Sequence, residues 1–83
     1  MRKASSRIPN NLKKYRRIMG YSQKEVAKIF GFKSPNRISR WEKGEAMPSV
    51  KNLLRLSALY ATLPNELYFE LWQEVKSKLK NRN

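Results

Sequence analysis

Apolar side chains recur at helical spacing in five successive segments of the chain. The first segment begins with Asn10 or Asn11, either of which can cap a helix. It carries Leu12 and Met19 on one face and stops at Gly20, a residue suited to a left-handed helix end. Similar patterns predict an all-α fold with further helices at residues 22–31, 34–44, 48–60 and 64–80.

Two short helices joined by a tight turn are predicted for residues 22–44. Ser22 and Glu25 match the S-x-x-E capping box, which starts a helix. Ser34 and Pro35 suit the N-cap and the first position of the next helix. A pair of this kind is the arrangement with which proteins lay one helix in a DNA groove.

The second helix of this pair has one apolar and one polar side. At 100° per residue, Ile38 and Trp41 fall on the half opposite Asn36. Asparagine pairs with adenine, and arginine with guanine, in the major groove. A solvent-facing helix is also polar on one side, so this face gains its weight from the helix that precedes it. The polar side chains on or beside this face are Asn36, Arg37, Ser39, Arg40 and Lys43.

Two charges fall on otherwise apolar helix faces. Arg16 lies beside the stripe of the first helix, and Glu42 lies on the inward side of the third. An unpaired buried charge is costly, so each is hard to explain alone. We predict an Arg16–Glu42 ion pair that ties the first helix to the third. The alternative is two independent surface charges.

The last segment, Pro64 to about Lys80, carries a wide apolar stripe at helical spacing. One small domain has limited core to cover such a stripe, so it is a candidate homodimer interface. Alternatively, the helix folds back over its own core. The proposed interface residues are Leu67, Leu71, Trp72 and Val75.

The charge of the chain favours a polyanionic partner. Its 83 residues include 19 Lys and Arg against six acidic residues, a formal net charge of +13. Such a charge opposes compaction by self-repulsion and is typical of nucleic-acid binding, although a basic surface can also serve solubility alone. Positions 1–9 contain Arg2, Lys3 and Arg7 and no acidic residue, and we predict them to be a flexible basic arm able to track phosphates.

Catalytic and metal-binding side chains are scarce. The chain has no His, Cys or Asp, so the usual nucleophilic triads and common metal ligands are missing. Glu66, Glu70 and Glu74 share a helix face, where they are better explained as partners of the helix dipole than as acid–base groups. We expect no enzyme activity, metal or cofactor. The absence of cysteine fits a cytoplasmic location, and no segment is apolar enough to predict a membrane span.

Four motifs follow one another along the chain: L-K-K-Y-R at 12–16, S-Q-K-E-V-A at 22–27, I-S-R-W-E-K-G at 38–44 and P-S-V-K-N-L-L-R-L at 48–56. Together they resemble the Cro and phage-repressor helix-turn-helix family, also called XRE-type. The resemblance covers residues 10–69 and implies a compact, five-helix, lambda-repressor-like domain. The chain then divides into an arm (1–9), this domain (10–69) and an extended C-terminal helix and tail (70–83).

The resemblance also implies roles for individual residues. It supports the Arg16–Glu42 pair and a phosphate contact by Gln23, whose place at a helix N-terminus already favours phosphate. The chain departs from the family in a turn one residue longer before Pro35, and in Ala61 where a glycine is usual. The implied base contacts are Ser34, Asn36, Arg37 and Arg40, and the implied phosphate contacts are Gln23 and Lys43. Ser22, Lys33 and Ser39 are further candidate phosphate contacts.

Three functional hypotheses follow from the sequence. The first is a sequence-specific, double-stranded DNA-binding transcriptional regulator, most simply a bacterial or phage repressor associated with the nucleoid. The second is an antitoxin-like subunit whose C-terminal helix holds a protein partner while the basic face binds operator DNA. The third is binding of nucleic acid or acidic membranes by charge alone.

Overall fold

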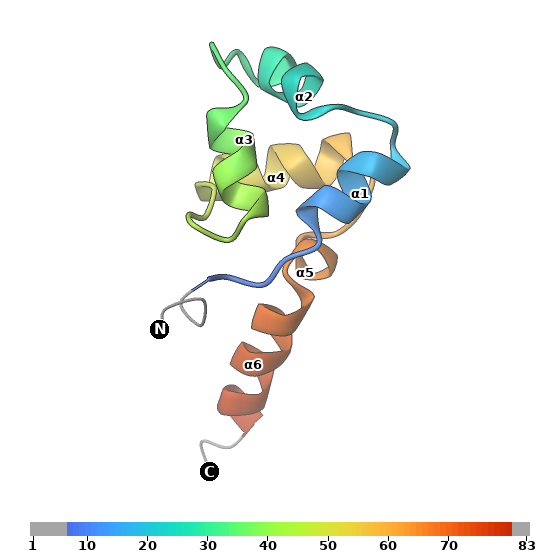
Figure 1. The fold of residues 1–83 in the computed structure, drawn as a ribbon. Coiled ribbons are helices and arrows are strands. Elements are labelled where there is room, and N and C mark those ends of the chain that lie inside the picture. Colours follow the sequence, from blue (N-terminus) through green and yellow to red (C-terminus); the bar gives the residue numbers. More distant parts are fainter. Residues whose placement is uncertain (1–6, 81–83) are drawn as a thin grey trace.

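The computed structural model describes residues 7–80, which contain six helices and no strand (Figure 1). The predicted all-α class is confirmed. Residues 1–6 of the predicted arm and 81–83 of the predicted tail lie outside the described residues. The helices are α1 (Leu12–Ile18), α2 (Gln23–Phe30), α3 (Asn36–Glu42), α4 (Val50–Leu59), α5 (Pro64–Leu67) and α6 (Phe69–Lys80).

Local capping signals explain where two of the helices begin. The Ser22 hydroxyl accepts from the backbone N–H of Glu25, and the Glu25 carboxylate accepts from that of Ser22, which completes the predicted capping box of α2. Ser49 caps α4 by accepting from the backbone N–H of Asn52. These bonds satisfy amides that a helix N-terminus leaves without partners.

The start of α3 differs from the prediction by one residue. Pro35 is the N-cap and Asn36 the first helical residue, whereas the sequence suggested Ser34 and Pro35 for these positions. The Ser34 hydroxyl accepts only a long bond, 3.4 Å, from the backbone N–H of Asn36. The longer turn before α3 therefore carries Ser34 outside the helix.

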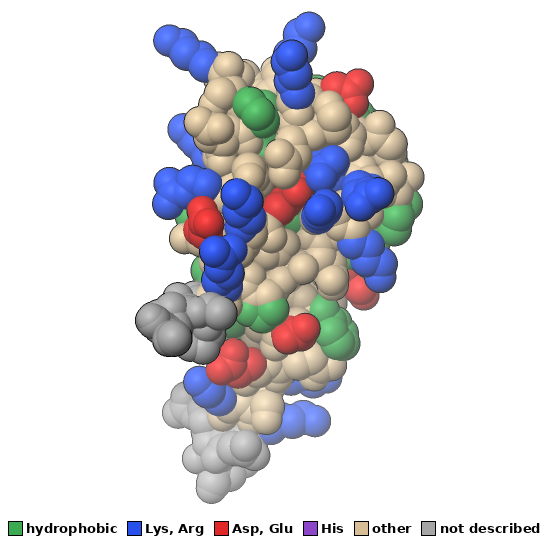
Figure 2. All heavy atoms as spheres, viewed as in Figure 1, with side chains coloured by type: hydrophobic (Ala, Val, Ile, Leu, Met, Phe, Trp, Pro, Cys, Tyr) green, Lys and Arg blue, Asp and Glu red, His purple; other side chains and the backbone are tan. Residues whose placement is uncertain are grey.

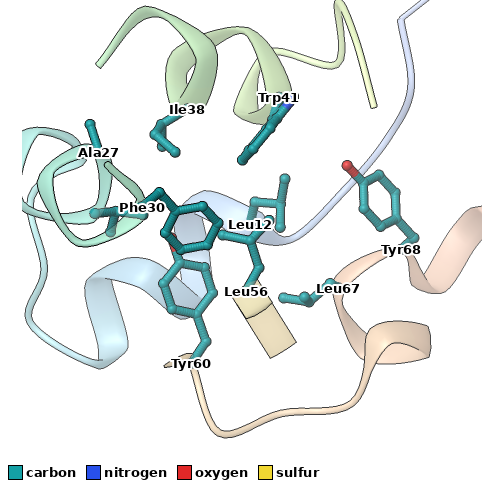
Figure 3. Close-up of a cluster of buried hydrophobic side chains, with 10 residues drawn as sticks. Leu12, Ala27, Phe30, Ile38, Trp41, Leu56, Tyr60, Leu67 and Tyr68 are labelled. Atoms are coloured by element: carbon teal, nitrogen blue, oxygen red, sulfur yellow. The ribbon is translucent and has the colours of Figure 1, made fainter. Parts of the chain in front are cut away.

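A single apolar core lies between the helices (Figure 3). Ile38 and Trp41 project from α3 into this core and are 1% and 3% exposed, so the predicted inward face of α3 is confirmed. Burial of this face sets the rotation of α3 about its own axis, which turns the opposite side outward. The other core residues are Leu12, Val26, Ala27, Phe30, Leu56, Tyr60, Leu67 and Tyr68.

The C-terminal segment forms two helices where one long helix was expected. Tyr68, with φ −123° and ψ 52°, interrupts the helix between α5 and α6. Its side chain and that of Leu67 are buried, whereas α6 contains no buried residue and extends away from the other helices (Figure 1). The C-terminal segment therefore covers the core with α5, Tyr68 and the partly buried Leu71 at the start of α6.

Candidate nucleic-acid interface

The turn between α2 and α3, together with the outer side of α3, forms a polar groove of about 480 Å³. The structure brings all four residues with implied base contacts to this groove, and each is exposed. Two of them are arginines with several N–H donors, and the others carry an amide and a hydroxyl. The groove is lined by Gly31, Phe32, Lys33, Ser34, Asn36, Arg37 and Arg40.

Arg37 stacks on an aromatic ring of the same groove. Its guanidinium carbon lies 4.2 Å from the centroid of Phe32. Phe32 in turn contacts Phe30 and Trp41 edge to face, at centroid distances of 5.7 and 5.9 Å. Phe32 was not singled out in the sequence, because nothing in the local pattern shows which aromatic residue of a turn will contact an arginine five positions later.

Arg40 has an acidic neighbour at the end of α3. Its Nε lies 3.8 Å from the Glu45 carboxylate, and Arg7 approaches the same carboxylate at 3.6 Å. All three side chains are substantially exposed to solvent, so these ion pairs are weak. The Arg40 guanidinium therefore remains available to an outside acceptor.

Beneath α3, the structure places the guanidinium of Arg16 against Glu42. Arg16 Nε donates to Glu42 Oε2 at 2.6 Å, and its Nη2 donates to Oε1 at 3.2 Å. Both side chains are nearly buried, 9% and 4% exposed. The hydrogen bond with Glu42 raises the pKa of Arg16 above its ordinary value, despite the opposing effect of desolvation. A charged pair thus links α1 to the end of α3.

Gln23 belongs to this buried network. Its Nε2 donates to Glu42 Oε1 at 2.8 Å, so one amide hydrogen is engaged within the protein. The second amide hydrogen remains, at the first position of α2, for a contact outside. The sequence pattern did not reveal the link to Glu42, since it joins two helices 19 positions apart.

The segment before α1 holds the C-terminal end of α3. The Asn10 amide donates to the carbonyls of Trp41 and Glu42, at 3.1 and 3.3 Å, and its oxygen accepts from the backbone N–H of Leu12. Asn10 and Asn11 were both predicted as possible caps of the first helix; Asn11 is the N-cap of α1, and Asn10 occupies carbonyls that the end of α3 leaves open. Gly44 has φ +77°, and a Cβ there would collide with the Ile8 carbonyl.

The candidate phosphate contacts come from α2, the turn and α3. Ser22 lies at the start of α2, where its hydroxyl serves the capping box. Lys33 lies in the turn, Ser39 is half-buried on α3, and Lys43 is exposed at the end of α3. Figure 2 shows Lys and Arg side chains over much of the body above α6, with acidic side chains over the upper part of α6.

Residues 7–80 contain no helix of the length and apolar character that crossing a membrane requires. In the same range, no group of three or more Cys, His, Asp or Glu side chains is placed to hold a metal ion.

A family model described as helix-turn-helix matches residues 12–67. The chain belongs to the Cro-type, or XRE, helix-turn-helix family. Members of this helix-turn-helix family are DNA-binding transcription regulators. The matched region runs from the first residue of α1 to the last residue of α5 and does not include α6. No curated protein and no solved structure matches the chain.

Proposed function

We propose that the protein is a sequence-specific, double-stranded DNA-binding transcriptional regulator, most simply a repressor, that inserts α3 into the major groove. The observation that carries this proposal is the two-sided construction of α3. Ile38 and Trp41 anchor its inner side in the core, while Asn36, Arg37 and Arg40 are exposed on its outer side and line the polar groove. A rigid helix with exposed amide and guanidinium groups suits direct readout of base edges.

In this proposal, base contacts and phosphate contacts come from different places. Asn36, Arg37 and Arg40 read bases, and Ser34 lies at the edge of the base-reading set because the longer turn carries it outside α3. The free amide hydrogen of Gln23 and the charge of Lys43 meet phosphates on either side of the groove, as do Ser22, Lys33 and Ser39. Phosphate contacts position the helix, whereas base contacts specify the sequence.

Selection of bound DNA from a random pool tests the proposal. A specific regulator should yield a common site and bind it ~10³-fold or more tightly than random DNA. Recovery of no common site would leave only charge-driven binding. With a site in hand, Arg40→Ala should cost ~1–3 kcal/mol and relax the preference at one position.

Lys43→Ala is the matched control for Arg40→Ala. It also removes an exposed cation from α3, but it should weaken binding to all sequences alike and reduce the salt slope by about one. Equal losses on specific and random DNA for Arg40→Ala would show that Arg40 does not read a base.

We also propose that two copies associate through α6, which supplies the pair of recognition helices that a palindromic site requires. The support is an exposed apolar surface: Trp72 and Val75 are 39% and 49% exposed, and with Leu71 they line an apolar groove of about 430 Å³ beside α4 and α5. Leu67 is withdrawn from this interface, because its side chain is fully buried in the core of its own chain.

Sedimentation at micromolar concentration, with and without the selected DNA, tests the association. We expect two copies to bind a palindromic site together, whereas the Val75→Glu variant should bind an isolated half-site as a monomer and lose this association without unfolding the domain. A strict monomer in both conditions would exclude the homodimer. Recovery of a tight heterologous complex through α6 would instead favour the antitoxin-like function.

A further inference from the structure

We propose that Phe32 is a positioning residue for base recognition: its ring holds the Arg37 guanidinium in the groove, ready to read one base. This inference rests on the proposed DNA-binding function and assigns part of its specificity to a residue of the turn. Phe32 and Arg37 line the same groove as Asn36 and Arg40.

The Phe32 ring is itself held in place. Its backbone N–H donates to the Ala27 carbonyl at 2.8 Å, which ties the turn to the end of α2. One ring neighbour is Trp41, at an interplanar angle of 75°, and the other is Phe30, at 61°. Phe30 and Trp41 are both buried in the core. Phe32 therefore links the outer groove to the buried core.

Stacking suits a guanidinium that has to recognise a base edge. Guanidinium N–H donors point outward in the plane of the group, so a ring against its flat face leaves them free. Guanine offers N7 and O6 as two acceptors in one plane, which a single guanidinium meets bidentately. Within residues 7–80 Arg37 forms no ion pair, in contrast to Arg40 with its Glu45 neighbour.

Holding a long side chain before binding lowers the entropy lost on binding. Immobilising one such side chain changes affinity by roughly two- to ten-fold. If Phe32 supplies this immobilisation, its benefit applies only to the base that Arg37 reads. The phosphate contacts, and therefore binding to random DNA, should not depend on the ring.

The test is a double-mutant cycle with Phe32 and Arg37. Arg37→Ala first identifies the base pair at which it abolishes the sequence preference. The quantity compared is then the Kd for a site mismatched at that base pair divided by the Kd for the selected site. Phe32→Leu should lower this ratio about three- to ten-fold and leave the salt slope unchanged. Phe32→Tyr, which keeps the ring, should restore most of the ratio. In an Arg37→Ala background, Phe32→Leu should have no further effect on it.

Equal weakening of all sequences by Phe32→Leu, or full additivity in the cycle, would overturn the inference and leave Phe32 a packing residue. Because Phe32→Leu also removes ring contacts with the core, the thermal midpoint is measured for each variant as a control.

NMR of the unaltered protein gives a second test. Ring-current shifts on the Arg37 side chain are expected, and their absence would show that the stack does not persist in solution. Failure of the proposed function would appear separately, as an unaltered protein with no sequence preference.

Discussion

Two regions of the molecule, the domain formed by α1 to α5 and the separate helix α6, carry the same kinds of side chains but bury them to different extents. Trp41 is 3% exposed in the domain, and Trp72 is 39% exposed on α6. The domain has a nearly buried ion pair, Arg16–Glu42, whereas α6 has the solvent-exposed pair Lys78–Glu74 at 3.6 Å. The helix-turn-helix match also stops between the two regions, at residue 67.

This difference shows that an apolar stripe predicts a helix face and does not identify what covers it. In the domain, the apolar faces of five helices cover one another, so the direction of α3 is fixed by the chain itself. On α6, Leu71 near the start of the helix packs against the core, but the helix then extends away from the other five (Figure 1), and Trp72, Val75 and Leu79 stay exposed. Stability should therefore depend on the domain, and association on α6.

The two tryptophans give the largest contrast. Trp41→Ala removes a buried ring from the core and should cost about 3–5 kcal/mol, enough to unfold much of the protein. Trp72→Ala removes a half-exposed ring and should cost less than ~1 kcal/mol in the monomer. Urea unfolding followed by circular dichroism, at concentrations too low for association, measures both. Similar losses for the two variants would show that α6 is part of the cooperative unit.

The two ion pairs give the next contrast. Glu42→Gln leaves Arg16 charged and nearly buried without its carboxylate, which should cost about 3 kcal/mol. Glu74→Gln is the same substitution in an exposed i, i+4 pair and should change stability by less than ~0.5 kcal/mol. Thermal unfolding of both variants decides the matter, and an unchanged midpoint for Glu42→Gln would show that the pair does not stabilise the fold.

How much the sequence predicts depends on the range of the interaction. Capping by Ser22 and the inward side of α3 with Ile38 and Trp41 follow from neighbours a few residues apart, and the structure confirms them. The bonds of Asn10 to α3 do not follow from local pattern, since they join residues 31 and 32 positions apart.

The same limit applies to the break at Tyr68 and to the groove. Helical spacing continues through Tyr68, but α5 ends there, at a residue whose backbone is not helical and whose ring is buried in the core. The groove residues were placed by the resemblance to a family with a known fold, whereas the stack of Arg37 on Phe32 required coordinates. Side-chain pairs specific to this chain are thus the part that the sequence did not predict.

A smaller effect is expected at the joint between α4 and α5. Ala61 has φ 54°, and it is the one non-glycine residue with positive φ in residues 7–80. A left-handed conformation costs an alanine roughly 1–2 kcal/mol, and replacement by glycine removes this cost. The greater conformational freedom of glycine in the unfolded chain offsets up to about 1 kcal/mol of that gain. Ala61→Gly should therefore raise stability by up to ~1 kcal/mol. Gly31→Ala, at φ +81° with open space around it, is the converse control and should lower stability.

The smallest effect concerns Tyr68, the residue at the boundary of the two regions. Its hydroxyl is buried without a hydrogen-bond partner within residues 7–80, at the edge of the core cluster (Figure 3). Removing an unsatisfied buried hydroxyl relieves a desolvation penalty, so Tyr68→Phe should be neutral or stabilising by up to about 1 kcal/mol. A loss of more than this in thermal unfolding would show that the hydroxyl has a partner in solution.

The pH dependence of Tyr68→Phe stability gives a second test of whether the Tyr68 hydroxyl is buried. Burial raises the pKa of Tyr68 to about 12, from an ordinary value near 10. The folded state therefore holds the phenol proton more tightly than the unfolded state, so this stabilisation is complete below about pH 10 and is lost as the pH rises towards 12. Burial also raises the pKa of Tyr60, which contributes a decline in the same direction. Unfolding midpoints of the Tyr68→Phe variant should consequently fall less steeply above about pH 10 than those of the unaltered protein, and equal slopes would place the Tyr68 ring in water.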